Sequence, residues 1–440
     1  MSNVMHRGAG APPRAARAAG GYIFDTDGKR YYDGSGGAAV SCLGHNHPKV
    51  VAALASQLET LDYAHTSFFS NGPMEELADF LVAAAPSPMA KAYFVSGGSE
   101  AIEAALKLAR QVAVERGESG RTRFVARRQS YHGNTLGALG VGGNAARREI
   151  FAPLLAPTAF VSPCYAYRDR GPAETDEAYG ARLAAEFEAT VTRLGGDTIL
   201  AFVVETVGGA TQGCTLPAPG YLAAIDAICK RHGIMLILAE VMCGMGRTGT
   251  LFAYETENVR PDIVAIAKGL GGGAQPIGAL LVAPGLAAVI EKGSGSFKHG
   301  HTYLGHPMAC AAALAVQRTI REENLLDNVR AMGARLEAGL LERLGNHAHA
   351  GDIRGKGLFW AVELVAARGT KAPFAPARKL AEAVKREAFA RGLLVYAMGG
   401  TIDGASGDHV MLAPPYNAVP GEIDFCVATL GAAIDAALAR

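Results

Sequence analysis

Between residues 90 and 285, short apolar runs alternate with longer segments whose apolar positions repeat every three or four residues. The short runs are typical of buried strands, and the longer segments are typical of amphipathic helices. This alternation predicts an α/β fold with a mostly parallel sheet covered by helices on both faces. The pattern predicts strands at residues 91–95, 123–127, 198–204, 234–238, 262–267 and 276–283.

The flanking segments follow a different pattern. Residues 21–33 predict a hairpin around the Asp27-Gly28 turn, and residues 357–365 predict a strand between helices. We expect the two chain ends to build a smaller α+β domain together. Its predicted parts are residues 1–60 and 321–440, with the large domain at 61–320, and the polar stretch 168–176 is expected to form a long exposed loop.

Composition and charge narrow the classes of partner. The chain has 42 basic and 41 acidic residues, which gives no electrostatic reason to expect nucleic acid or an anionic membrane surface. Its longest apolar run, residues 308–316, is too short to span a membrane. The seven cysteines lie singly, without the spacing of a zinc site or a disulfide scaffold. We therefore expect a cytoplasmic protein that acts on small molecules and binds no metal.

The first 19 residues contain arginines and no acidic residue, which is compatible with an organelle transit peptide. Pro12, Pro13 and the scarcity of hydroxyl side chains favour an irregular basic arm instead.

Polar residues gather where the predicted strands end. Ligands of open α/β sheets bind beyond the carboxyl ends of the strands, so we expect one crevice to collect these residues. They are Ser96-Gly97-Gly98-Ser99, Ser130-Tyr131-His132-Gly133, Glu205, Ala239-Glu240 and Lys268.

Three of these positions indicate a chemistry, each with a plainer alternative. Gly98 and Ser99 at a helix start leave backbone N–H groups free to bind phosphate, although a simple helix cap has the same residues. Lys268 follows a buried strand, where a desolvated amine loses charge and can form a Schiff base, unless it is an ordinary exposed lysine. Tyr131 can stack on a flat ring or merely pack.

Residues 269–274, GLGGGA, have the spacing of a dinucleotide-binding fingerprint. That fingerprint must open a helix, whereas the QPIGALLVA segment that follows reads as a strand. We therefore disfavour a dinucleotide site.

Taken in order, the motifs resemble those of the class III, or ω-type, aminotransferases, which are pyridoxal-phosphate enzymes of fold type I. The resemblance covers nearly the whole chain and implies a mostly parallel seven-stranded sheet, pyridoxal 5'-phosphate as cofactor, and a homodimer or tetramer with active sites at its interface. The matching segments are YYDGSGGAAVSCLGHNHP, SGGSEAIEAALK, SYHGNT, VVET, LAEVMCGMGRTG, AIAKGLGGG, HGHTYLGHPMACAAALA, RGKGLFWAVEL and LAPPY.

The resemblance also assigns roles at the two ends of the cofactor. It implies that Lys268 holds the cofactor covalently and carries the substrate proton, and that Gly98 and Ser99 bind the phosphate. Thr302 is implied to reach the phosphate of the neighbouring subunit's cofactor.

Around the cofactor ring, the resemblance places Tyr131 on one face and Val241 on the other. His132 and Glu205 belong to the same implied site, with Glu205 near the substrate. Ala239 departs from the family pattern, which has an aspartate paired with the pyridine nitrogen at this position. Without that carboxylate the ring is a poorer electron sink, and we expect a loss of roughly a hundredfold to a thousandfold in rate.

Glu240 is not expected to replace the missing carboxylate, because adjacent strand residues point to opposite faces. Three explanations of Ala239 remain open: an engineered inactivating change, a natural paralogue that transaminates slowly, and rescue by another group. Other departures are Ala38, Ala39, Ala274 and a 401–409 loop without the arginine by which many relatives bind a substrate carboxylate. They predict a roomier pocket and leave its selectivity for carboxylates open.

Arg354 is a further candidate for binding an anion, although we favour a structural role for it. The favoured function is transfer of an amino group from an amine or ω-amino acid to a small 2-oxo acid such as pyruvate. The alternatives are a racemase, mutase or decarboxylase on the same fold, and a cofactor-binding homologue with little turnover.

Overall fold

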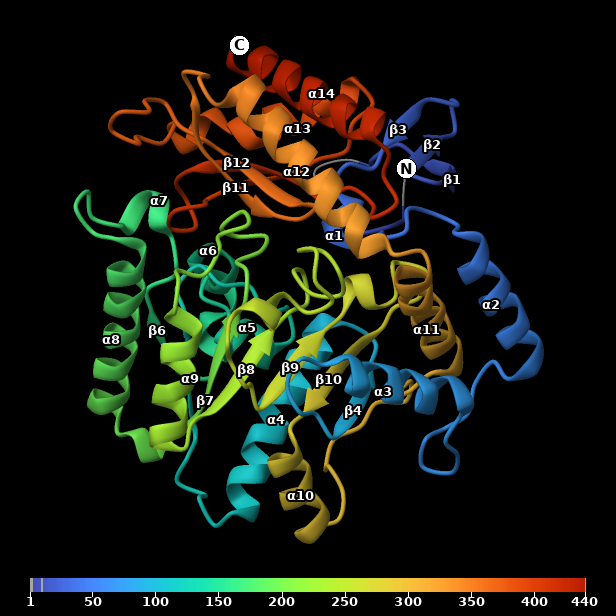
Figure 1. The fold of residues 1–440 in the computed structure, drawn as a ribbon, viewed down its shortest axis with the longest axis vertical. Coiled ribbons are helices and arrows are strands. Elements are labelled where there is room, and N and C mark those ends of the chain that lie inside the picture. The colour runs from blue at the N-terminus through green and yellow to red at the C-terminus, as the bar shows by residue number, and fades with distance from the viewer. Residues whose placement is uncertain (1–2, 9–10, 440) are drawn as a thin grey trace.

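The computed structural model describes residues 3–8 and 11–439 (Figure 1). A seven-stranded sheet forms its centre, in the order β4-β10-β9-β8-β7-β5-β6. β10 pairs antiparallel with both neighbours, and the other neighbouring pairs are parallel. The strands are β4 (Lys91–Val95), β5 (Arg123–Arg127), β6 (Thr158–Val161), β7 (Ile199–Glu205), β8 (Met235–Ala239), β9 (Ile263–Ile266) and β10 (Gly278–Val282). The predicted α/β fold is confirmed.

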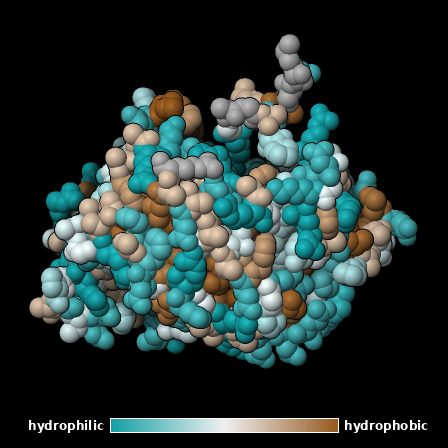
Figure 2. Space-filling model, turned by 90° about the horizontal axis from the view of Figure 1, so that it is seen from above, coloured by the Kyte–Doolittle hydropathy of each residue, from teal (hydrophilic) through white to brown (hydrophobic). Residues whose placement is uncertain are grey.

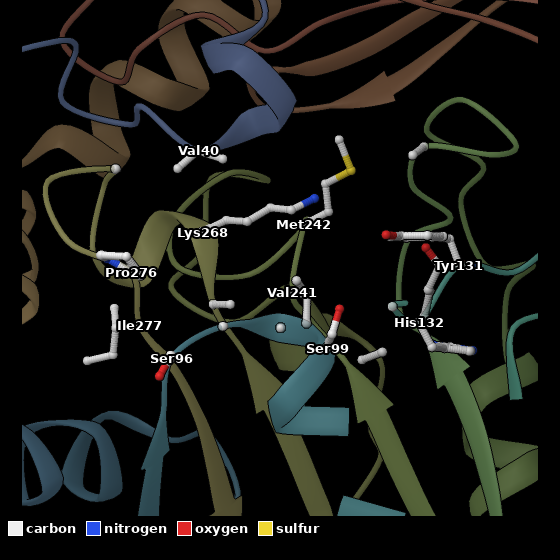
Figure 3. A pocket seen from close by; sticks show the side chains of 18 of the residues that line it. Val40, Ser96, Ser99, Tyr131, His132, Val241, Met242, Lys268, Pro276 and Ile277 are labelled. Atoms are coloured by element: carbon white, nitrogen blue, oxygen red, sulfur yellow. The ribbon is translucent and has the colours of Figure 1, made fainter. Parts of the chain in front are cut away.

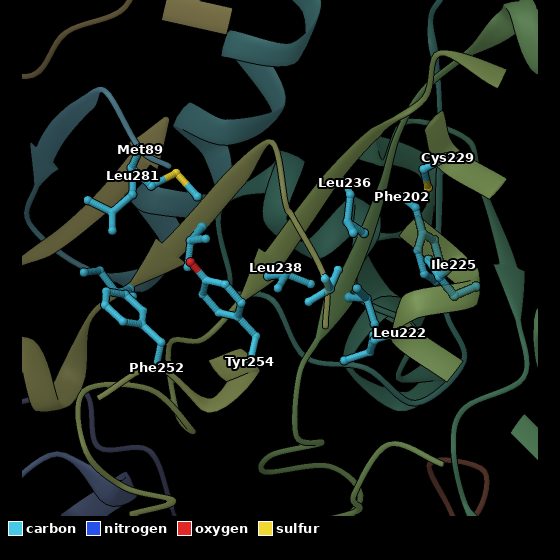
Figure 4. Packing of buried hydrophobic residues seen from close by; sticks show 14 of the residues in the cluster. Met89, Phe202, Leu222, Ile225, Cys229, Leu236, Leu238, Phe252, Tyr254 and Leu281 are labelled. Atoms are coloured by element: carbon cyan, nitrogen blue, oxygen red, sulfur yellow. The ribbon is translucent and has the colours of Figure 1, made fainter. Parts of the chain in front are cut away.

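Both faces of this sheet are buried, which explains why its strands read as continuous apolar runs. One face packs against α4 (Gly98–Glu115) and α10 (Pro284–Lys292). On the other face, Phe202 and Leu236 pack against Leu222 and Ile225 (Figure 4). The helices of this second layer are α3 (Gly72–Ala84), α8 (Asp176–Leu194), α9 (Tyr221–His232) and α11 (Pro307–Glu322).

The two chain ends lie together above the large sheet (Figure 1). Tyr32 and Val50 share an apolar core with Trp360 and Ile434, so the N-terminal segment and the C-terminal part pack as one body. This body contains a three-stranded sheet of β1 (Ala15–Ala19), β2 (Tyr22–Asp25) and β3 (Arg30–Tyr32). It also contains a four-stranded sheet in the order β11 (Ala350–Lys356), β12 (Phe359–Leu364), β14 (Asp408–Leu412) and β13 (Tyr396–Gly399). The domain boundaries at 60/61 and 320/321 stay a prediction.

The larger helices of this upper body cover the four-stranded sheet that contains β12. They are α12 (Leu325–Leu344), α13 (Leu380–Ala390) and α14 (Pro420–Leu438). The remaining helices are α1 (Gly36–Ala39), α2 (Pro48–Thr60), α5 (Leu136–Val141), α6 (Ala145–Arg148) and α7 (Ala166–Asp169). Within the described residues, none combines the length and apolar character that crossing a bilayer requires.

Two local expectations were wrong. The expected basic arm includes β1, which pairs antiparallel with β2, while residues 1–2 and 9–10 lie outside the described residues. The expected long loop at 168–176 is shorter, because α7 extends to Asp169 and α8 begins at Asp176. Arg168 is largely buried there, with its Nε 2.6 Å from a carboxylate oxygen of Glu363.

Candidate active site

A cavity of about 360 Å³ opens at the carboxyl ends of the central strands (Figure 3). Ser96, Tyr131, Glu205, Ala239 and Lys268, which follow or end different strands, all line it. The structure therefore brings the polar strand ends together in one crevice, as the topology of an open sheet requires.

Lys268 follows β9, and its backbone has a φ of 47°, a left-handed conformation that is costly for a residue with a side chain. Its side chain extends across the cavity (Figure 3). Burial lowers the pKa of the amine to about 8, and Glu205 partly opposes that shift. At neutral pH a useful fraction of Lys268 is therefore the neutral amine, which is the nucleophilic form.

Glu205 ends β7 with its carboxylate held in place by backbone donors. Tyr131 N donates to one oxygen at 3.2 Å, and Gly209 N donates to the other at 2.9 Å. Burial raises the pKa of this carboxyl group, while the buried Arg127 guanidinium opposes the shift. Glu205 is the one carboxylate among the described residues that line the cavity.

The start of α4 offers the cavity an uncapped helix N-terminus. Gly97 precedes the helix without a capping side chain, and within the described residues the Gly98 and Ser99 amides donate no hydrogen bond. A Cβ on Gly98 would lie 2.7 Å from a Val241 methyl group, so the helix start packs too closely for a larger residue. Free amides and the helix dipole together suit a phosphate group.

Aromatic and apolar side chains line the cavity between Lys268 and the start of α4. In Figure 3, Val241 lies at the centre of the cavity floor, with Lys268 to one side and Tyr131 to the other. His132 is buried, and neither ring nitrogen has a hydrogen-bond partner within the described part of the chain. Burial lowers its pKa to about 3, so the imidazole is neutral.

At the end of β8, Ala239 faces the cavity and Glu240 faces away from it. Glu240 accepts hydrogen bonds from Thr206 Oγ1 at 2.8 Å and from the amides of Ala253 and Tyr254 at 2.7 Å each. Its burial raises the pKa of the carboxyl group to about 7. The expectation that Glu240 cannot replace a carboxylate at position 239 is confirmed.

Two other candidates lie away from the cavity. Thr302 is exposed, and its carbonyl accepts a hydrogen bond from the Tyr63 hydroxyl at 2.9 Å. Arg354 donates to the carbonyls of Gln212 and Gly213 and to Asp352 and Glu363, so its predicted structural role is confirmed.

The glycine-rich segment after Lys268 begins no α-helix. A short 3₁₀ turn at Lys268–Leu270 is followed by further turns into β10. The geometry of a dinucleotide fingerprint is therefore absent from this described segment, as the strand pattern predicted.

Several apolar lining residues gave no signal in the sequence. They complete the cavity wall from four separate segments, and they are Val40, Val207, Met242, Pro276 and Ile277. Val40 lines the cavity, whereas Ala38, Ala39 and Ala274, the positions that predict a roomier pocket, are not among its lining residues.

An aldehyde that carries a phosphate group fits this arrangement, because a neutral amine and an open helix N-terminus face one cavity. The cavity lacks one group that would complete this fit, because position 239 is an alanine and carries no carboxylate.

A family model and a similar protein sequence both match known aminotransferases. The family model of the class-III aminotransferases matches residues 5–434. An uncharacterized aminotransferase of Schizosaccharomyces pombe is 44% identical over 429 residues, which cover 97% of this chain and 94% of the relative.

Two solved structures share the fold over nearly their whole length. A thermostable (S)-enantioselective ω-transaminase from Thermomicrobium roseum has a TM-score of 0.91 and 37% identity, covering 97% of this chain and 93% of the other. An amine transaminase from an uncultivated Pseudomonas species, in its PLP-bound form, has a TM-score of 0.91 and 36% identity, covering 100% and 99%.

Proposed function

Because the chain belongs to the pyridoxal-phosphate-dependent class III aminotransferases, we propose that it transfers an amino group from an amine or ω-amino acid to a small 2-oxo acid such as pyruvate. The observation that carries this proposal is the buried amine of Lys268 in the same cavity as the open N-terminus of α4. The cavity volume of about 360 Å³ suits a small substrate beside the cofactor.

In this proposal Lys268 binds the cofactor covalently, and its Nζ then takes up and returns the proton of the substrate carbon. Gly98 and Ser99 bind the phosphate through the start of α4. Pyridoxal phosphate, once bound, supplies an electron-withdrawing ring that draws electron density from the substrate carbon.

The remaining predicted residues shape the ring site. Tyr131 and Val241 pack against the ring, and the neutral His132 lies beside Tyr131. Two backbone amides orient the Glu205 carboxylate, which acts electrostatically on the Lys268 amine. The missing carboxylate at Ala239 supports slow turnover, so a cofactor-binding homologue with little activity is the second candidate.

We also propose a homodimer in which Thr302 of one subunit reaches the phosphate site of the other. Thr302 is exposed, and the same surface carries Tyr303, which is 60% exposed. Phe68 and Phe69 are 79% and 66% exposed, and contiguous exposed apolar side chains are typical of protein–protein interfaces. Light scattering should give twice the mass of one chain, and a monomer that retains full activity would contradict this arrangement.

A donor panel tests the proposed reaction. The holoenzyme is incubated with amines or ω-amino acids, together with pyruvate or 2-oxoglutarate, and products are identified by chromatography. We expect consumption of the 2-oxo acid in step with loss of the amine. Loss of chirality in an amino acid without 2-oxo acid consumption would instead indicate a racemase, and no reaction with any donor would favour the non-enzymatic alternative.

The depressed pKa of Lys268 predicts a pH dependence for cofactor uptake. Only the neutral amine attacks the aldehyde, so the uptake rate of the cofactor-free protein should rise with pH through about 8. Glu205→Gln should move this midpoint to lower pH, because Glu205 raises the pKa of the amine. Stopped-flow absorbance after mixing with pyridoxal phosphate measures the rate, and an uptake rate independent of pH between 6 and 10 would refute the assignment.

A further inference from the structure

Gln317 on α11 is bonded to the 3₁₀ turn that begins with Lys268. Its Nε2 atom donates to the carbonyl oxygens of Gly269 and Leu270, both at 2.9 Å. The NH2 end of the amide is the end that can face two carbonyl oxygens, so these contacts fix the orientation of the amide. Gln317 therefore uses both of its N–H donors on the two residues that follow Lys268.

The Gln317 side chain is buried. Hydrophilic residues cover much of the surface seen in Figure 2, where water can solvate them. Gln317 lacks that solvation, because it is 1% exposed and the other buried residues of α11 are mainly apolar. Its Oε1 atom has no hydrogen-bond partner among the described residues. A buried amide with one end unbonded is costly, so its presence in this helix indicates a role beyond packing.

The two carbonyl oxygens depend on Gln317 in turn. Gly269 and Leu270 are buried, so the oxygens need partners from within the protein. Within the described residues, no backbone N–H donates to either oxygen. The Cys42 thiol, 3.5 Å from the Gly269 oxygen, is the other side-chain donor there, and a thiol is a weak one. Loss of the Gln317 amide would therefore leave the Leu270 oxygen without a partner.

Lys268 itself needs support from its surroundings. Its φ of 47° is left-handed, and a residue with a side chain keeps such a conformation where the surrounding structure holds it. α11 also packs closely just after the turn, where a Cβ on Gly272 would lie 3.2 Å from a Val316 methyl group. The helix is therefore a firm support for the turn that carries the Lys268 side chain.

We propose that Gln317 is a positioning residue that holds the Lys268 amine where it meets the cofactor aldehyde and the substrate proton, a proposal that rests on the proposed amine transfer. Gln317 is not among the lining residues of the cavity, so it acts through the backbone of the turn. A displacement of about 1 Å at a reacting group can cost about a hundredfold in rate. The proposed phosphate site, Gly98 and Ser99, lies on a different element, α4.

The test is cofactor uptake by the cofactor-free full chain over a range of pyridoxal phosphate concentrations, followed by stopped-flow absorbance. Gln317→Met keeps the length of the side chain and removes both donors, so we expect the limiting rate to fall by roughly tenfold to a hundredfold. The half-saturating concentration should change by less than about twofold, because the phosphate site is untouched. This readout needs no amine donor, so it tests Gln317 even if no donor is converted.

Gln317→Glu adds a pH signature that a merely structural role would not produce. Burial favours the protonated form of a carboxyl group, and that form can donate one hydrogen bond where glutamine donates two. At about pH 6 the limiting rate should lie between those of Gln317→Met and the parent. Relative to the parent it should fall as the pH rises to about 9, because the ionised carboxylate cannot donate. The ratio of Gln317→Met to the parent should stay constant.

Thr319→Val is the matched control. Thr319 is also buried on α11, and its hydroxyl donates within the helix, to the Ala315 carbonyl at 2.8 Å. The variant removes a buried polar group from the same helix without touching the turn, so it should keep the limiting rate of the parent. Thermal unfolding of the cofactor-free proteins shows that each variant is folded at the assay temperature.

Three results would overturn the proposal. One is a limiting rate for Gln317→Met within about twofold of the parent. Another is an equal loss in Thr319→Val, which would indicate a general disturbance of α11. The third is a half-saturating concentration that rises as much as the rate falls, which would place the effect on cofactor binding. Each of these leaves the proposed function standing, whereas a parent protein that takes up no cofactor would overturn both.

Discussion

Replacing Lys268 by alanine is expected to lower the rate of amine transfer by roughly a thousandfold, because the variant loses both its covalent link to the cofactor and its proton carrier. The amine is the one ammonium-forming group among the described residues that line the cavity. Burial is the largest cause of its low pKa, and the charge of Arg247 lowers it further. No other described lining residue carries an amine that could act as an equivalent nucleophile. A single-turnover assay with one equivalent of amine donor measures the loss.

Lys292→Ala is a suitable control for this variant, because Lys292 is exposed at the end of α10. It should retain the parent rate, and circular dichroism should be unchanged in both variants. A Lys268→Ala protein that reacts within about tenfold of the parent would show that another group carries the proton and the cofactor.

Introducing aspartate at position 239 is expected to raise the rate by about a hundredfold to a thousandfold, since each 1.36 kcal/mol of barrier is worth about tenfold. Ala239 lines the cavity floor, where an added carboxylate can keep the pyridine nitrogen protonated. His132 lines the same cavity, and its ring nitrogens have no hydrogen-bond partner among the described residues.

Ala239→Asn separates charge from shape, because asparagine has nearly the same size and no carboxylate. We expect the asparagine variant to stay near the parent rate while the aspartate variant gains. The rate is measured as kcat/KM for the best donor of the panel. Equal rates in the two variants would mean that protonation of the ring does not limit this enzyme.

The central sheet was predictable because buried parallel strands leave long apolar runs in the sequence. The sequence pattern does not predict β6, which lies at the sheet edge, where three of its four residues are only partly buried, so it lacks the continuous apolar run of a buried strand. β1 was also missed, since its sequence AARAA has little strand propensity and its place depends on backbone pairing with β2.

The polar half of the site was equally predictable, because parallel strands bring their carboxyl ends to one edge. Residues such as Val40 could not be found in this way. Val40 reaches the cavity from the N-terminal segment, which packs with the C-terminal part of the chain.

The central claim is that Lys268 is the residue that binds pyridoxal phosphate. Reduction of the holoenzyme with borohydride, followed by proteolysis and mass spectrometry, tests it directly. The account predicts one phosphopyridoxyl-modified peptide, with the modification on Lys268. A modification on another lysine, or none at all after incubation with excess pyridoxal phosphate, would contradict it.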